Sequence, residues 1–130
     1  MMPQLLLLDT DVLIDYLRDR TEAVDYLESL TPSLLVSAVT VAELYAGVRD
    51  GDERNVLDEF IQSFQVVPLD NQIAVTAGLI RRDYGKSHGT GLADAIIAAT
   101  AQIQNANLVT LNRKHFPMVK DIVVPYQKAQ

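Results

Sequence analysis

The feature that most constrains this chain is a run of four leucines that ends at acidic residues. Residues 5–8 are apolar without a break, and Asp9 and Asp11 follow almost at once. An unbroken apolar run of this length is typical of a strand covered on both faces, as in a parallel sheet. Ligands of such sheets bind in the crevice just beyond the carboxyl ends of the strands. The carboxylates after this strand are therefore placed for chemistry.

The rest of the chain alternates short apolar segments with segments of helical periodicity. This alternation favours an α/β fold with a mainly parallel sheet. The chain has 130 residues, the size of one ordinary domain, and no repeat or linker divides it. Strands are predicted at 34–39, 66–69, 108–109 and 122–124, and helices at 12–17, 21–30, 40–48, 56–64, 70–84 and 92–104.

Polar residues and glycines mark where these helices are expected to begin and end. Thr10 or Asp11 is expected to cap the first helix, and Thr40 to open the helix after the second strand. Asp70 is expected to cap the long helix before the most apolar one. Residues 85–91 contain three glycines and predict a loop between those two helices.

Composition limits the kinds of site that this chain can build. It contains no cysteine, which excludes disulfides, thiolate nucleophiles and cysteine-based metal centres. Its 17 acidic and 11 basic residues give a net charge of -6. Because affinity for phosphate comes largely from Lys and Arg, contact with nucleic acid would need a local basic patch or a bound divalent cation. An acidic chain also suits a basic protein partner.

The sequence predicts no targeting or membrane segment. The first residues carry no positive charge, and Asp9 interrupts the first apolar run too early for a secretory signal. No apolar stretch approaches the roughly 20 residues that span a bilayer. A soluble, cytoplasmic protein with no membrane partner is the resulting expectation.

Three acidic residues stand on apolar segments, whereas most others lie in turns or on polar faces. Asp9 ends the first strand, Glu43 lies one turn into the helix after the second strand, and Asp94 lies in the otherwise uncharged segment 91–99. Each also has a structural interpretation. Asp9 and Asp94 could be helix caps, and Glu43 has capping-box spacing from Thr40. Since an unpaired buried carboxylate costs several kcal/mol, Asp94 is expected to have a partner.

Convergence of Asp9, Glu43 and Asp94 would create a pocket of like charges that requires a cation. Oxygen ligands without cysteine favour Mg²⁺ or Mn²⁺. Such an ion can activate water and stabilise the leaving oxygen of a phosphodiester. This chemistry is the first functional hypothesis.

The segment 110–116 supplies a fourth group of candidates. Asn112 could orient a water or contact the metal, and Arg113 and Lys114 could hold phosphate. A polar turn is the alternative interpretation of the same residues. Asp11 could cap the first helix or support the direct ligands of a metal, and His115 could be a general base or a surface or packing residue. His88 has no assigned role.

Four motifs in order give this chain a family resemblance. They lie at 8–14 (LDTDVLI), 40–44 (TVAEL), 92–101 (LADAIIAATA) and 108–112 (LVTLN). Together they resemble the PIN-domain ribonucleases, and with the chain length they look most like the VapC toxins of toxin–antitoxin pairs. The resemblance covers essentially the whole chain.

The resemblance implies one three-layer α/β/α domain over residues 1–130 and Mg²⁺- or Mn²⁺-dependent cleavage of RNA. It places the metal ligands on Asp9, Glu43 and Asp94, and a fourth, normally acidic, catalytic position on Asn112. An amide there has no charge, so a second metal should bind more weakly or only together with substrate. Homodimers and a VapB-like antitoxin whose tail covers the active site are the implied partners. Thr10, Thr110, Arg113 and Lys114 are the candidate contacts for RNA.

Two other functions are compatible with the same residues. Asp9 and Asp11 form an Asp-x-Asp pair after a strand, which also opens aspartate-dependent phosphatases of the haloacid dehalogenase type. That alternative lacks a convincing lysine and acidic pair later in the chain. The remaining alternative is a catalytically inactive PIN-like module that docks a partner.

Overall fold

The structure, a computed structural model, describes residues 5–31 and 33–127 and contains a sheet of five parallel strands. Chain order differs from spatial order, which is β3-β2-β1-β4-β5. After β1 the chain adds β2 and β3 on one side of it, and then returns to add β4 and β5 on the other side. The strands are β1 (Leu6–Leu8), β2 (Leu34–Ser37), β3 (Gln65–Val67), β4 (Asn107–Val109) and β5 (Ile122–Val123).

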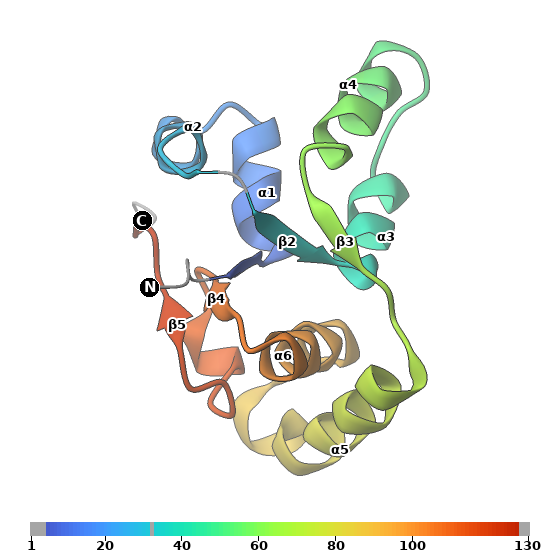
Figure 1. Cartoon of the computed structure of the whole chain (residues 1–130), viewed down its shortest axis with the longest axis vertical. Coiled ribbons are helices and arrows are strands. Elements are labelled where there is room, and N and C mark those ends of the chain that lie inside the picture. Colours follow the sequence, from blue (N-terminus) through green and yellow to red (C-terminus); the bar gives the residue numbers. More distant parts are fainter. Residues whose placement is uncertain (1–4, 32, 128–130) are drawn as a thin grey trace.

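Helices cover both faces of the sheet, which confirms the predicted three-layer α/β/α architecture (Figure 1). One layer contains α1 (Thr10–Leu17), α2 (Thr21–Glu28), α3 (Ala38–Ala46) and α4 (Asp52–Ile61). The opposite layer contains α5 (Asn71–His88) and α6 (Leu92–Gln104), and a short 3₁₀ helix, η1 (Arg113–His115), follows β4. None of the helices within the described residues has the length and apolar character needed to cross a bilayer.

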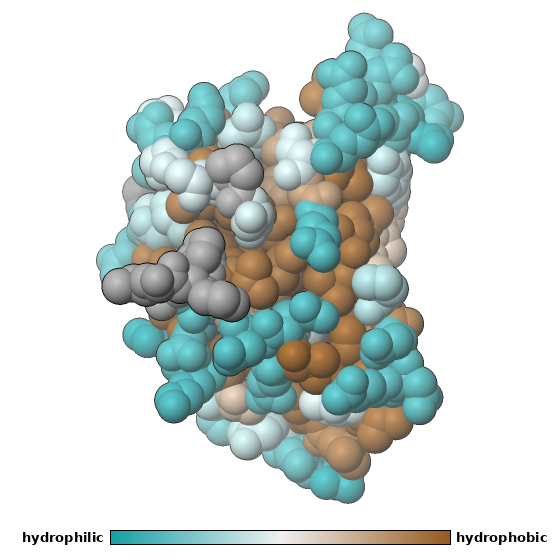
Figure 2. All heavy atoms as spheres, in the orientation of Figure 1, coloured by the Kyte–Doolittle hydropathy of each residue, from teal (hydrophilic) through white to brown (hydrophobic). Residues whose placement is uncertain are grey.

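The leucine run is buried because successive strand residues face opposite layers. Leu7 packs in the core with α5 and α6, whereas Leu8 packs in the core with α1 to α4. Both side chains are fully buried. The view in Figure 2 shows apolar residues gathered in the middle of the molecule and hydrophilic residues on the outer helices. A strand covered on both faces has no polar side, which explains its unbroken apolar sequence.

Two helices begin earlier than their sequence patterns predict. The N-cap of α1 is Asp9, and neither Thr10 nor Asp11 has that role. The N-cap of α3 is Ser37, which accepts a hydrogen bond from the backbone N of Val39 at 3.2 Å. Thr40 therefore lies inside α3, and the predicted capping box between it and Glu43 is wrong.

The long helix α5 extends further than expected. Asp70 caps it as predicted, accepting a hydrogen bond from the backbone N of Ile73 at 2.9 Å. The predicted loop at 85–91 is correct for 89–91, which connect α5 to α6, and wrong for 85–88, because α5 continues through Gly85 to His88. Glycine costs a helix roughly 1 kcal/mol relative to alanine, and the packing of one face of α5 on the core outweighs that cost. The helix ends where Gly89 adopts a left-handed φ of 65°.

Candidate functional site

The sequence-predicted site lies where the direction of sheet building reverses, between β1 and β4. These strands are parallel neighbours, with Leu8 in register with Val109. The next residue of each strand is polar, Asp9 after β1 and Thr110 after β4. Parallel strands end at the same edge, so these two side chains meet there. Such a reversal is the usual place for a ligand in an open α/β sheet.

Asp9 is both a helix cap and a buried carboxylate at this edge of the sheet. Its Oδ1 accepts a hydrogen bond from the backbone N of Thr10 at 2.8 Å. Its Oδ2 accepts one from the hydroxyl of Thr110 at 2.7 Å, across 101 residues of sequence. Asp9 is only 5% exposed. The cap and site interpretations are therefore compatible, because each carboxylate oxygen has a different partner.

Crowded negative charge surrounds Asp9. Burial, assisted by the nearby carboxylates of Asp11 and Asp94, raises its pKa from 3.8 to about 7. Hydrogen bonds from Thr110 and Thr10 lower the pKa, but they do not cancel the increase. The fold therefore brings the charges of Asp11 and, more weakly, Asp94 within electrostatic reach of Asp9.

Glu43 is held at the rim of this edge by a hydroxyl chain. The hydroxyl of Thr10 lies 2.7 Å from Oε1 of Glu43 and 2.9 Å from the hydroxyl of Thr40. A carboxylate oxygen only accepts, so Thr10 donates its single proton to Glu43 and accepts from Thr40. Thr40 is fully buried. Thr10 thus acts on Glu43, which goes beyond the RNA contact predicted for it.

Thr40 is a site residue that sequence reasoning missed. The spacing from Glu43 has a local explanation, a capping box, and so does not by itself indicate a role in the site. The usable signal is that residues three apart lie on one face of a helix. Any helix that includes Thr40 and Glu43 directs both toward the same neighbour, here Thr10.

We expect Thr10→Val to weaken both folding and function. The change preserves shape and leaves the buried Thr40 hydroxyl without its acceptor, so the free energy of unfolding should fall by about 1–2 kcal/mol. Urea denaturation measures that loss. The RNA cleavage that the family resemblance implies should fall by roughly tenfold, since Glu43 loses its positioning partner.

The matched control for this change is Thr100→Val in α6. Thr100 is also buried, and its hydroxyl donates to the carbonyl of Ile96 at 2.7 Å within the same helix. Its removal should leave the cleavage rate of the folded protein unchanged. Equal losses of cleavage in the two variants would refute the positioning role of Thr10.

Asp94 lies at the beginning of α6 and has two partners. Its Oδ2 accepts a hydrogen bond from the backbone N of the N-cap residue, Gly91, at 3.2 Å. Gly91 has no side chain to return the bond, so this is only one half of a capping box. The same oxygen lies 3.6 Å from Nδ1 of His115. The side chain is 29% exposed, so it is only partly desolvated. Asp94 is therefore not the N-cap of α6, which is Gly91, but its side chain accepts from the N–H of that residue while its charge acts on Asp9.

The loop after β4 carries the remaining predicted residues. Asp11 Oδ2 accepts hydrogen bonds from the backbone N of Leu111 at 3.1 Å and from Nδ2 of Asn112 at 3.4 Å. Asp11 thereby orients Asn112 beside the carboxylate group. The backbone N of Asn112 also donates to the hydroxyl of Thr110 at 3.0 Å. Asn112 is thus linked directly to Asp11 and, through the hydroxyl of Thr110, to Asp9.

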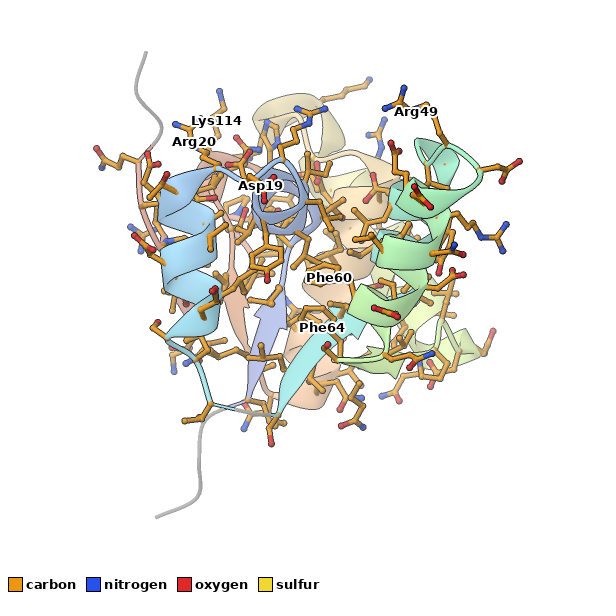
Figure 3. All side chains as sticks on the ribbon, turned by 90° about the horizontal axis from the view of Figure 1, so that it is seen from above. Asp19, Arg20, Arg49, Phe60, Phe64 and Lys114 are labelled. Carbon is orange, nitrogen blue, oxygen red and sulfur yellow. The ribbon has the colours of Figure 1, made fainter. Side chains whose placement is uncertain are left out.

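Cations occupy the same edge of the molecule as these acids. Arg113 and Lys114 are exposed on η1. Figure 3 places Lys114 and Arg49 at the edge toward which the strand arrows point. In that view the two residues lie on opposite sides of the edge, and Arg49 pairs with Glu53. Arg113 and Lys114 are therefore the neighbouring exposed cations that could help an acidic chain to approach phosphate. His88, by contrast, lies at the end of α5 and contacts Ser87.

Comparison with known proteins agrees with this geometry. The family model described as the PIN domain matches residues 6–121. The chain belongs to the PIN-domain family. Ribonuclease VapC10 of Mycobacterium tuberculosis is 42% identical to this PIN domain over 125 residues, which are 94% of this chain and 93% of that protein. Ribonuclease VapC19 of the same organism is 36% identical over 124 residues, 92% of this chain and 98% of that protein.

Solved structures share the fold of this PIN domain. A chain from a toxin–antitoxin complex of Klebsiella pneumoniae is 30% identical to it, with a TM-score of 0.82. The similarity covers 95% of this chain and 99% of that chain. The three-layer arrangement is therefore one that solved structures contain.

The residues of this PIN domain suit a metal with mixed ligands. Within residues 5–31 and 33–127, no three His, Asp or Glu side chains are arranged so that they could hold a metal ion by themselves. Mg²⁺ is usually held by one or two carboxylates, with waters and phosphates as its other ligands. Asp9 and Asp94 fit that role, since crowding of like charge is what a cation relieves. Joint binding by Asp9, Glu43 and Asp94 stays a prediction.

Proposed function

We propose that this protein is an endoribonuclease that hydrolyses RNA phosphodiester bonds with the aid of Mg²⁺ or Mn²⁺. The observation that carries the proposal is the environment of Asp9, which is buried at the sheet reversal and crowded by the charges of Asp11 and Asp94. Natural sites tolerate such a group when it serves chemistry. Membership of the PIN family favours the nuclease over the aspartate-dependent phosphatase.

RNA is proposed as the substrate because relatives that align over nearly the whole chain are named ribonucleases. Fold alone does not imply function, so the residues of the site must also suit the reaction. Exposed cations at the carboxyl edge, Arg113 and Lys114, supply contacts for phosphate. The carboxylates at the sheet reversal supply the negative charge that a divalent cation would need.

The roles of the site residues follow from their contacts. Bound Mg²⁺ or Mn²⁺ would supply polarisation of a water and of the scissile phosphate. Asp9 and Asp94 would hold that ion. Glu43, which Thr10 orients, would add a third negative charge near it. Asn112 would orient water or substrate through the amide that Asp11 holds.

Cleavage is expected to depend on a divalent cation. The purified protein should cut single-stranded RNA internally when Mg²⁺ or Mn²⁺ is present, and EDTA should stop the reaction because the like charges then have no counterion. Gel analysis of an end-labelled RNA measures both effects. Full activity in EDTA would contradict the proposed metal dependence.

We further propose that the protein is the toxin of a toxin–antitoxin pair in the cytoplasm. A chain of the Klebsiella pneumoniae toxin–antitoxin complex aligns with it almost end to end. A VapB-like antitoxin with a basic tail would complement its net charge of -6, and a homodimer is the proposed assembly. Expression without antitoxin should slow growth, and Asp9→Ala should restore it.

The alternative, a catalytically inactive module that docks a partner, predicts the opposite results for metal binding and cleavage. In that case the protein would bind no Mg²⁺ by calorimetry and cleave no RNA, yet bind the product of a neighbouring gene tightly. Measurements of metal binding, cleavage and partner binding on one preparation therefore separate the two functions.

A further inference from the structure

A groove of about 640 Å³ lies beside the carboxylates and extends away from them. One wall is the segment after β4, which includes Asn112 and Arg113. The other wall is the segment after β5, which includes Val124 and Tyr126. Asp11 lies in the lining as well, so the groove opens directly from the proposed active site. The segment after β5 has no part in the function described so far.

A hydrogen bond to a buried carboxylate fixes the second wall. The hydroxyl of Tyr126 donates to Oδ2 of Asp15 at 2.9 Å, across 111 residues of sequence. Asp15 is buried in α1, and Nε of Arg20 lies 3.9 Å from the same oxygen. Burial and the hydrogen bond to Asp15 raise the pKa of Tyr126, so the phenol keeps its proton. The ring is therefore anchored in place before any ligand arrives.

The groove combines the chemical groups that bind a nucleotide. Arg113 is exposed and offers a guanidinium to a phosphate. Asn112 offers an amide to the edge of a base, and Tyr126 and Val124 offer apolar surface to its face. Sites for single-stranded nucleic acids use this combination of cations and aromatic rings. The volume also lies within the range of about 300–1,000 Å³ that small-ligand pockets occupy.

Charge within the groove favours a nucleotide over a basic peptide. A peptide would need an acidic wall, and Asp11 is the acidic residue of the lining. Oδ2 of Asp11 already accepts hydrogen bonds from Leu111 and Asn112. Arg113, in contrast, is exposed at the mouth. Asp11 keeps its negative charge but is only half-exposed and holds the segment after β4, whereas the exposed guanidinium of Arg113 can meet a phosphate.

We propose that this groove binds the RNA nucleotide next to the scissile phosphate, with Arg113 on its phosphate and Tyr126 against its base. The assignment to RNA rests on the proposed nuclease function. Tyr126 and Val124 then contribute to base preference, and the segment after β5 becomes part of the substrate site. Figure 3 shows that segment rising along the side of the molecule toward the corner where Lys114 is labelled.

The test is an NMR titration of the metal-free protein with AMP, CMP, GMP and UMP in EDTA. Backbone amide signals of residues 111–113 and 124–127 should shift, and one nucleotide should bind most tightly. Arg113→Gln should weaken binding about tenfold, the effect of losing one charged hydrogen bond. The matched control is Arg82→Gln, which removes an exposed arginine of α5 that pairs with Asp83.

A second variant keeps the test valid if changes at Tyr126 impair folding. Val124 is 39% exposed, so Val124→Glu adds a negative charge to the wall without removing a buried contact. It should also weaken nucleotide binding about tenfold, because it repels phosphate. Tyr126→Ala, where folded, should reduce the difference in affinity among the four nucleotides.

Three outcomes would overturn the inference. These are nucleotide shifts confined to other surfaces, equal affinities in Arg113→Gln and Arg82→Gln, and a groove that responds to tri-arginine but to no nucleotide. RNA cleavage, measured separately, distinguishes this failure from failure of the proposed function. Cleavage without groove binding refutes the groove alone, whereas groove binding without cleavage supports the groove and refutes the nuclease.

Discussion

Replacing Asp94 by asparagine is expected to lower the rate of RNA cleavage by roughly 10²–10³-fold. The change removes a charge that lies within electrostatic reach of Asp9 but preserves the shape of the side chain. The asparagine oxygen can still accept the hydrogen bond from Gly91, so the beginning of α6 should persist. The free energy of unfolding should therefore change by less than about 1 kcal/mol. Cleavage assays and urea denaturation on the same samples separate the two effects.

Asp70→Asn is the matched control for this substitution. Asp70 also accepts a backbone hydrogen bond at a helix N-terminus, from the N of Ile73 at 2.9 Å, but it is exposed at the beginning of α5. Loss of charge at a helix N-terminus should by itself affect the two variants alike. The proposed mechanism fails if Asp94→Asn cleaves RNA as fast as Asp70→Asn.

The second large effect concerns the stability of the metal-free protein as a function of pH. The pKa of Asp9 is about 7 in the folded protein against 3.8 ordinarily, chiefly because the side chain is buried. Between these values the folded state binds more protons at Asp9 than the unfolded state does. Stability should therefore fall as the pH rises from about 4 to about 7. A shift of about three units corresponds to about 4 kcal/mol.

Asp9→Asn isolates this contribution, because all other titrating groups are shared by the two proteins. The variant should match the wild type near pH 4 and become more stable than it by up to about 4 kcal/mol above pH 7. Thermal or urea denaturation in EDTA at several pH values measures the difference. Addition of Mg²⁺ at pH 8 should stabilise the wild type and leave the variant unchanged. If the stabilities of the two proteins changed with pH in parallel, the pKa of Asp9 would not be raised by folding.

These expectations share one structural cause, the reversal of sheet building between β1 and β4. It places Asp9 beside Thr110 and brings the beginning of α1 against α3. Asp9 is then held by the hydroxyl of Thr110, and Glu43 by the hydroxyl of Thr10. The site is thus held in place where Thr10 and Thr110 contact the carboxylates, and it is open toward Asn112 and the neighbouring groove.

The candidate site could be found in the sequence because carboxylates on apolar segments conflict with burial. Asp9 and Asp94 were visible in this way, and both have charged neighbours in the folded protein. Thr40 was missed because a local capping interpretation was available for it. The anchoring of Tyr126 to Asp15 was missed for another reason, since the two residues are 111 positions apart and neither belongs to a motif.

The sequence by itself determined the α/β class, the doubly covered first strand and the family. Those properties follow from local patterns, namely apolar runs, helical periodicity and motifs of a few residues. Tertiary structure alone decided which hydroxyl meets which carboxylate, where α1 and α3 begin, and that α5 continues through Gly85. The physical reason is that these choices depend on neighbours brought together by the order of the strands. Packing against those neighbours outweighs local preferences of about 1 kcal/mol per residue.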